Sequence, residues 1–287
     1  MGIMLHLGRP IAHACILLLA TCAIPACARD GVCDVPAGLH RSLRPARMIL
    51  MGEMHGTAEA PAAFGTTVCH ALGHGLAVSA GLELTPDQTA ALARYLASSG
   101  DQIAVARLLR TPFWSRAAQD GRASVAMMML VERLRRLQQR YPLLSVFSLA
   151  EDSGLADPGS VRGAAMAARV RAERERRPEA LILTLTDKVH NRLASSPAGA
   201  RPGGEAVPRP MGALLTDLAP LAVLLETDGG SAWVCAPECG VLNLPRHGAP
   251  ADPRVPFREL ASDPAYTSLW SLGAGTASPP AKLAFQR

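Results

Sequence analysis

Residues 48–56, MILMGEMHG, place a carboxylate and an imidazole directly after four apolar residues. Glu53 and His55 are two positions apart, and Gly52 and Gly56 stand on either side, where the chain can turn sharply. A histidine beside a carboxylate on a rigid strand end can act as a general base towards water. The pattern therefore favours a buried strand that ends at a catalytic or ligand-binding group.

Three further groups of polar residues also follow short apolar runs. They are Glu83 at the end of 76–84, Glu151 with Asp152 after 143–149, and Asp187 with His190 after 180–186. In open α/β sheets, ligands bind beyond the carboxyl ends of the strands. We therefore expect His55, His190 and several of these carboxylates to converge on one edge of a sheet.

The elements that must position these residues alternate along the chain. Strand-like runs occur at 48–51, 76–84, 143–149, 180–186, 221–225 and 232–235, and helical patterns at 58–72, 86–98, 102–111, 124–140, 162–177 and 211–218. Thr85 is the expected N-cap of the second helix, with Pro86 at its first position. Strands that alternate with helices of this length pair in parallel. We therefore expect an α/β fold with a mostly parallel central sheet, helices on both faces, and the site at the carboxyl ends of the strands.

The segment GEMHG, followed by Glu59 and Pro61, resembles the first signature of a known superfamily. This superfamily joins the erythromycin esterases, the ChaN-like haem-binding lipoproteins and the Tiki-type proteases. Glu83 matches the glutamate that similar proteins carry at the end of the next strand. His190 matches the histidine of a later Gly-Asn-x-His element, although this chain has Asp187 and Lys188 where that element has Gly and Asn. Segments 120–124, 210–215 and 229–235 are also similar to elements of the bacterial branch, so the resemblance spans 48–239.

The resemblance implies a hydrolase of esters or amides. In it, His55 would activate water, Glu53 or Glu83 would orient the imidazole or share its proton, and His190 would be a second acid/base or polarising group. An arginine would stabilise the oxyanion. The implied catalytic residues are His55, Glu53, Glu83, His190 and Arg122, with Arg192 as a second candidate for the oxyanion.

Two branches of the superfamily imply a cofactor, and the residues alone leave its identity open. The Tiki-like branch implies zinc or manganese, with Glu53, His55, Glu83 and His190 as acceptable ligands. The ChaN-like branch implies haem bound without catalysis, with His55 or His190 as the axial ligand. Aromatic residues make up only 4% of the chain, which weakens the haem hypothesis because haem faces usually need broad apolar walls.

Each of these residues also has a purely structural interpretation. Glu53 could cap a helix or form a salt bridge, and Glu83 could cap the helix that begins at Pro86. His190 could be a core histidine, and Arg122 could serve only the helix terminus at Ser124. A pair between Asp187 and Lys188 would narrow or block the site, and the chain would then be an inactive scaffold that keeps the fold.

His70 and His74 have the i, i+4 spacing of a metal-binding pair. Gly73 lies between them and is expected to end the helix there. The spacing is therefore not interpreted as a metal site.

Composition bounds the class of the protein. With 49% hydrophobic residues in 287, the chain can bury a large core, and it is not broadly disordered. The net charge of +5 includes no compact basic run, since glutamates interrupt the arginines of 169–177. Low aromatic content also argues against a stacking surface for nucleic acid. The expected partner is a small-molecule or peptide substrate.

The N-terminal residues have the pattern of an export signal. Arg9 precedes an uncharged apolar stretch, 14–24, that is too short to span a bilayer. Small residues at Ala26 and Ala28 are typical of a cleavage site, while IPAC at 24–27 loosely resembles a lipobox that would lipidate Cys27. We therefore expect a signal at 1–28, an α/β domain at 29–245 and a Pro-rich extension or tail at 246–287. The mature protein would be periplasmic or anchored to the outer membrane.

Export changes the interpretation of the cysteines. Of seven cysteines, four remain in the mature domain, and an even number in an oxidising compartment indicates two disulfides. Cys235 and Cys239 can pair across a turn, which leaves Cys33 to pair with Cys69. A zinc site is the rival hypothesis, but no second C-x3-C pair accompanies CAPEC.

Overall fold

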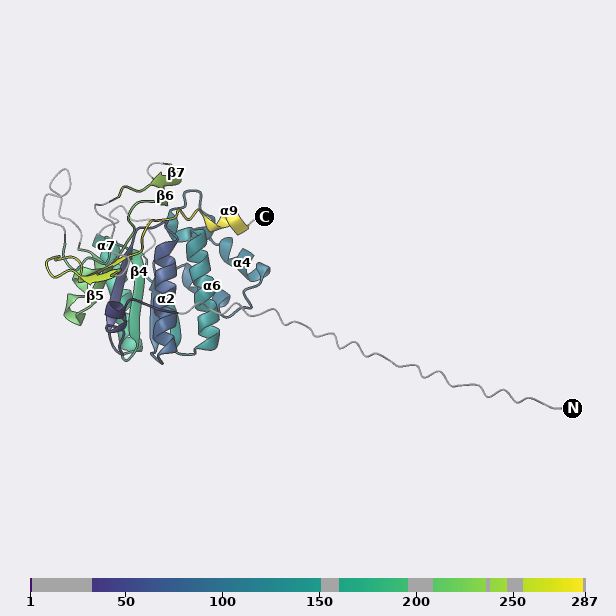
Figure 1. Cartoon of the computed structure of the whole chain (residues 1–287), viewed down its shortest axis with the longest axis horizontal. Coiled ribbons are helices and arrows are strands. Elements are labelled where there is room, and N and C mark those ends of the chain that lie inside the picture. The colour runs from purple at the N-terminus through teal and green to yellow at the C-terminus, as the bar shows by residue number, and fades with distance from the viewer. Residues whose placement is uncertain (2–32, 151–159, 196–208, 236–237, 247–254, 286–287) are drawn as a thin grey trace. The chain divides into compact units, whose positions relative to one another are not determined.

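The computed structural model describes residues 1, 33–150, 160–195, 209–235, 238–246 and 255–285. The expected signal at 1–28 with Cys27, the strand-end residues Glu151 and Asp152, and most of 195–210 lie outside these ranges. Cys33–Arg287 forms one compact unit, which Figure 1 shows as a sheet between layers of helices.

Seven strands form the central sheet in the order β3-β2-β4-β1-β5-β9-β8. They are β1 (Met48–Glu53), β2 (Val78–Leu82), β3 (Leu144–Ser148), β4 (Leu181–Asp187), β5 (Leu221–Glu226), β8 (Phe257–Glu259) and β9 (Ser268–Ser271). All neighbours pair in parallel except β8 and β9. The remaining described strands, β6 (Ser231–Cys235) and β7 (Cys239–Asn243), form a separate antiparallel hairpin. The predicted α/β fold with a mostly parallel sheet is confirmed.

Helices cover both faces of the sheet, and β1 shows how. The helices are α1 (Ala37–His40), α2 (Glu59–Gly73), α3 (Gln88–Leu96), α4 (Gln102–Leu109), α5 (Pro112–Ser115), α6 (Val125–Arg140), α7 (Ser160–Arg176), α8 (Met211–Leu214) and α9 (Ala281–Phe285), with 3-10 turns η1 (Gly121–Ala123) and η2 (Thr216–Leu218). Ile49 and Met51 pack in one core cluster with α2 and α6, whereas Met48 and Leu50 pack in another with α7 and α8. Successive side chains of a strand point to opposite faces, so a strand covered on both faces is apolar at every position.

The helix expected at 86–98 begins two residues later than predicted. Asp87 is its N-cap position, so the assignment of Thr85 as N-cap is wrong. The segment before it is held by the sheet, because Leu84 is buried and its carbonyl accepts a hydrogen bond from the backbone N–H of Ala150. That tertiary contact keeps the chain out of the helical conformation for longer than the local sequence signal indicates.

The sheet continues into 246–287, the segment that the sequence predicts to be an extension or tail. β9 pairs in parallel with β5, and β8 pairs with β9. Leu269 and Trp270 are buried in this part of the sheet. The apolar pattern does not predict these strands because they have only four and three residues.

Both predicted disulfides are present. Cys33–Cys69 ties the segment before α1 to α2, and Cys235–Cys239 closes the β6–β7 hairpin. Disulfides persist in oxidising compartments, so the pair favours a non-cytoplasmic environment. Among the described residues, no helix is long and apolar enough to cross a membrane.

Candidate active site

The carboxyl ends of β1, β2 and β4 bring the predicted site residues together. β4 lies between β1 and β2, and its register pairs Glu53 with Asp187. Glu53 is the last residue of β1, Glu83 directly follows β2, and His55 and His190 follow β1 and β4. Residues far apart in the sequence meet because three neighbouring parallel strands end at the same edge.

His55 lies between two buried carboxylates. Its Nδ1 is 2.9 Å from Oε1 of Glu53, and its Nε2 is 3.2 Å from Oε2 of Glu83. The first contact is a hydrogen bond, whereas the second lacks the alignment of one. The side chain of His55 is only 15% exposed and those of both glutamates 3%. The imidazole is therefore fixed from one side, while Nε2 can still serve another partner.

Glu83 is the centre of the cluster. Its Oε1 lies 3.3 Å from Nη1 of Arg122 and 3.8 Å from Nε2 of His190. Its Oε2 accepts a hydrogen bond of 2.8 Å from the backbone N–H of Asp187. Glu83 does not cap α3, whose N-cap position is Asp87. The structural alternative for Glu83 is therefore wrong.

Burial and neighbouring charges move the pKa values of four of these groups. Burial raises the pKa of Glu53 and lowers the pKa of His190. Burial alone would lower the pKa of His55, but the charge of Glu83 and the contacts with both carboxylates outweigh it and raise that pKa well above its usual range. Burial opposes ionisation of Glu83, but the charge of His55 prevails and holds the pKa of Glu83 well below its usual range. At neutral pH, His55 is therefore an imidazolium and His190 a neutral imidazole.

Arg122 contacts two carboxylates. Its Nη2 is 2.6 Å from Oδ2 of Asp120, and its Nη1 faces Glu83. Burial would lower the pKa of Arg122, but the hydrogen bonds that it donates to Asp120 raise it. Arg122 therefore helps to keep Glu83 ionised. It does not cap α6, because Ser124 accepts the hydrogen bond from the backbone N–H of Met127.

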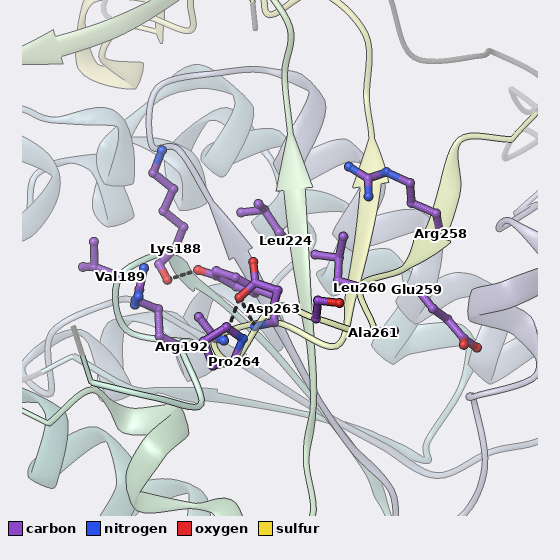
Figure 2. Close-up of a pocket in the computed structure, with 13 residues that line it drawn as sticks. Lys188, Val189, Arg192, Leu224, Arg258, Glu259, Leu260, Ala261, Asp263 and Pro264 are labelled. Carbon is purple, nitrogen blue, oxygen red and sulfur yellow. Dashed lines mark hydrogen bonds between the residues drawn. The ribbon is translucent and has the colours of Figure 1, made fainter. Parts of the chain in front are cut away.

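Asp187 and Lys188, where the chain departs from the superfamily pattern, do not block the cluster. Oδ1 of Asp187 accepts a hydrogen bond of 2.9 Å from the backbone N–H of Val189, which stabilises the turn after β4. Lys188 is exposed, and its side chain extends away from Arg192 (Figure 2). No ion pair joins Asp187 to Lys188 in the part of the chain that the structure describes.

Two residues that the sequence did not single out lie over Gly52. A Cβ added to Gly52 would be 3.4 Å from both Nδ2 of Asn191 and Cε1 of Tyr266. Asn191 is fully buried, and its side-chain oxygen and nitrogen have no hydrogen-bond partner among the residues that the structure describes. The hydroxyl of Tyr266 donates to the carbonyl of Lys188. Asn191 could have been suspected from its place beside His190, but Tyr266 comes from the expected tail and has no sequence signal.

A pocket of about 800 Å³ opens beside the cluster (Figure 2). Lys188 and Arg192, from the turn after β4, line it together with Leu224 of β5. Arg258 and Leu260 belong to its opposite wall, and none of the four clustered site residues lines it. The pocket is therefore a neighbouring space that shares the turn after β4 with the cluster.

The cluster does not fit a metal ion or haem. Each ring nitrogen of His55 already faces a carboxylate oxygen, at 2.9 Å for Nδ1 and 3.2 Å for Nε2. Among the described residues, three possible metal-ligand atoms lie within 4.8 Å of one another in His40, His70 and His74. None of these residues belongs to the cluster. A haem would need His55 or His190 in the wall of a wide pocket, and the pocket beside the cluster has neither.

No protein-family model and no curated protein matches the chain. Several solved structures match the chain. An erythromycin esterase, EreC, in its open conformation matches with a TM-score of 0.58 and 11% identity, over 84% of this chain and 93% of that one. A succinoglycan biosynthesis protein matches with a TM-score of 0.63 and 8% identity, over 86% and 93%.

A third structure, a Bacillus cereus protein, matches with a TM-score of 0.56 and 10% identity, over 85% of this chain and 92% of the other. These TM-scores establish a shared fold, whereas identities this low do not establish a shared activity. The activity must be argued from the site residues. The chain therefore shares its fold with these three proteins, and one of them is an erythromycin esterase, a class of protein that its GEMHG segment resembles.

Proposed function

We propose that this chain is an exported hydrolase that uses water to cleave an ester or amide in a small-molecule or peptide substrate. The observation that carries the proposal is His55, a buried imidazole with a carboxylate at each ring nitrogen. Buried charges cost folding free energy unless they are paired, so a protein keeps them where they serve another purpose. Perturbed titratable groups at the ligand-binding edge of a sheet are typical of catalytic sites.

The proton positions support particular roles. His55 already holds a proton on each nitrogen, so it must lose one before it can activate water, the role expected from the resemblance. His190 is neutral, and its Nε2 is 3.8 Å from Glu83, too far for a direct hydrogen bond. In the proposal, a water near His190 gives it a proton, and the charged His55 stabilises the transition state.

In the proposed reaction, one water molecule adds to the carbonyl group of the ester or amide. Water transfers a proton to Nε2 of His190 while its oxygen attacks the carbonyl carbon, and the π electrons move to the carbonyl oxygen. Nε2–H of His55, which has no aligned acceptor, donates a hydrogen bond to that oxyanion. Collapse of the intermediate breaks the C–O or C–N bond, and the leaving group takes the proton from His190. The products are a carboxylic acid and an alcohol or amine.

We propose that the pocket beside the cluster binds the part of the substrate that does not react. It is lined by Lys188, Val189 and Arg192, which belong to the same turn after β4 as His190. Its walls combine cations and carboxylates with apolar side chains: Lys188, Arg192, Arg258, Glu259, Asp263, Leu224 and Leu260. Such walls suit a polar organic molecule with an apolar part.

The test is hydrolysis of p-nitrophenyl acetate, p-nitrophenyl butyrate and a macrolide lactone by the purified protein. His190→Asn removes the base and is expected to lower kcat/KM by about 10²–10⁴-fold. Glu226→Gln is the matched control, because it changes a strand-end carboxylate of β5 outside the cluster and should leave the rate unchanged. Wild-type rates in both His190→Asn and His55→Asn would contradict the proposal and favour the inactive scaffold.

The pH profile separates the two possible bases. If His190 is the base, kcat/KM rises with pH only below its ordinary pKa of 6.5 and is level at neutral pH, because its pKa is lowered. If His55 is the base, kcat/KM rises only above neutral pH, because its pKa is raised. A rise confined to alkaline pH would overturn the assignment of His190.

Export is part of the proposal and has its own test. Two disulfides support a non-cytoplasmic location, and the expected signal precedes the described domain. We expect the mature chain to begin near residue 29, or at a lipid-modified Cys27. Mass spectrometry of the N-terminus of the protein from bacterial envelope fractions distinguishes the two, and an uncleaved chain in the cytoplasm would contradict both.

A further inference from the structure

Three histidines meet at the end of α2 that is remote from β6. His40 ends α1, His70 lies in the last turn of α2, and His74 is the C-cap of α2. One ring nitrogen from each lies within 4.8 Å of the other two. The backbone of Trp233 in β6 bonds to Gly56 just before α2, whereas His70 and His74 follow Gly56 by fourteen and eighteen residues, at the other end of the helix. Figure 1 shows α2 running between these two ends.

His70 and His74 keep their helical arrangement although α2 ends between them. α2 does end at Gly73, as the sequence predicts, but the backbone N–H of His74 still donates to the carbonyl of His70 at 3.1 Å. The two side chains therefore stay on one face, with ring centroids 4.2 Å apart. His40 completes the group from another element, which the sequence spacing could not reveal.

Hydrogen bonds to backbone carbonyls orient two of the imidazoles. Nδ1–H of His70 donates to the carbonyl of Cys33 at 2.6 Å, and Nδ1–H of His74 donates to the carbonyl of His70 at 2.8 Å. Each bond leaves Nε2 as the nitrogen with the lone pair. Metal-binding histidines usually hold their second ring nitrogen in this way. The Cys33–Cys69 disulfide keeps the carbonyl of Cys33 in place beside His70.

The third imidazole faces one of these lone pairs. Nδ1 of His40 is 2.8 Å from Nε2 of His70. Without a metal, a proton on His40 bridges them. Zinc bonds of about 2.0–2.1 Å in a tetrahedral site need about 3.3 Å between ligand nitrogens, so the pair must open by about half an ångström. His40 is exposed, and rotation of its side chain can provide that change.

The surroundings of His70 favour its neutral form. Burial, together with the neighbouring His74 and His40, lowers the pKa of His70. Arg41 and Arg44 line the same cleft of about 410 Å³. Mg²⁺ does not suit this group of imidazoles, because it prefers oxygen ligands.

We propose that His40, His70 and His74 bind one divalent transition metal ion, of the Zn²⁺, Ni²⁺ or Cu²⁺ class, through three imidazole nitrogens. Imidazole ligands suit these metals, with Cu²⁺ bound most tightly. The remaining coordination positions face the cleft and take water or another ligand. This site is separate from the Glu53–His55–Glu83 cluster and does not depend on the proposed hydrolysis.

The test is titration of the purified full chain, without a polyhistidine tag, with Zn²⁺ and Cu²⁺ by calorimetry. We expect one equivalent of each metal to bind and the His40→Asn/His74→Asn double variant to bind at least about 100-fold more weakly. His190→Asn is the control, because it removes a histidine at the other edge and should leave metal affinity unchanged. Co²⁺ added to the wild type should produce a visible d–d band that the double variant lacks.

Three results would overturn the proposal. They are no metal binding by the wild type, unchanged affinity in the double variant, or loss of affinity in His190→Asn. Both substituted histidines are exposed, so the metal-free double variant should melt at the temperature of the wild type. If it does not, the single variants His40→Asn and His74→Asn are measured instead, and each must weaken binding at least about tenfold.

Discussion

Glu83 shows, at the scale of a single residue, how this fold holds a buried charge. A carboxylate moved out of water loses several kcal/mol of hydration free energy. Three groups offset that loss for Glu83: the imidazolium of His55, the guanidinium of Arg122 and the backbone N–H of Asp187. The three groups come from the segment after β1, from η1 and from the end of β4, so the charge also ties these segments to the carboxyl end of β2.

Replacement of Glu83 with glutamine is therefore expected to destabilise the protein. The substitution leaves the imidazolium of His55 with only one carboxylate in a buried site, and breaking such a pair costs about 3–5 kcal/mol. Urea denaturation gives the loss of unfolding free energy. Glu226→Gln, at the end of β5, is the control and should change stability by less than about 0.5 kcal/mol. Equal effects would show that Glu83 is not specially paired.

The stability of the protein should depend on pH through His55. Because the pKa of His55 is raised in the folded state, its stabilisation is complete below its ordinary value of 6.5 and is lost as pH rises through the folded pKa. Glu83 has the opposite sign, and its stabilisation is lost below 4.5. The pair therefore contributes fully between pH 4.5 and pH 6.5.

The difference in unfolding free energy between wild type and His55→Asn isolates this effect. It should fall steadily as pH rises above 6.5, measured up to about pH 9. The charge of His55 also contributes to the lowered pKa of His190, so the two proteins are compared above pH 6.5, where His190 is neutral in both. A difference that is constant with pH would mean that the pKa of His55 is not raised.

At the scale of elements, three loops meet where β1 turns into α2. Gly56 has φ of +88°, and a Cβ there would lie 1.9 Å from the carbonyl oxygen of Trp233 in β6. A Cβ on Gly121 in η1 would lie 1.8 Å from the backbone nitrogen of Gly56. Only glycine allows these backbones to approach so closely, which is the physical reason for the second glycine of GEMHG.

Gly56→Ala should therefore lower the free energy of unfolding by more than an alanine in a left-handed conformation does by itself. The strained φ and the clash with Trp233 together are expected to reduce unfolding free energy by about 3 kcal/mol. Gly75→Ala is the matched control, because Gly75 has φ of +78° but open space around its Cβ position. Its loss should be about 1 kcal/mol in urea denaturation. Equal losses of unfolding free energy in the two variants would mean that the backbone near Trp233 moves to accommodate the Cβ without a measurable loss of stability.

At the scale of the whole molecule, the C-terminal segment completes the sheet and reaches the candidate edge. β9 adds to β5, and isolated bridges join Thr57 to Ala277 and Ser124 to Pro280. Tyr266 from the same segment lies over Gly52. The last residues of the chain thus support loops that carry His55 and Arg122.

A chain that ends at residue 245 should therefore not reach the native state. It lacks β8, β9 and α9, so the edge of β5 and its apolar neighbours are left in water. We expect aggregation or loss of the near-ultraviolet circular dichroism signal. A chain that ends at Phe285 keeps every described element and is the control. Native spectra and a cooperative melt in the shorter chain would disprove this requirement for the C-terminal strands.

Local sequence was sufficient to predict much of this protein. The runs MILM and LILTLT are apolar at every position, because their strands are covered on both faces, and this pattern predicts strands and a parallel sheet without any long-range information. Glu53, His55, Glu83 and His190 stand where such runs stop, so their common edge followed from the fold class. Both disulfides followed from the number and spacing of the cysteines.

Only the tertiary structure decided what depends on distance in space. Strands of three and four residues bury too little apolar surface to leave a pattern, so β8, β9 and Tyr266 were not predicted. His40 joins His70 and His74 through the packing of α1, which no spacing records. The protonation of His55 depends on a second carboxylate that β2 brings within 3.2 Å, because electrostatic free energy follows separation and burial and not position in the chain.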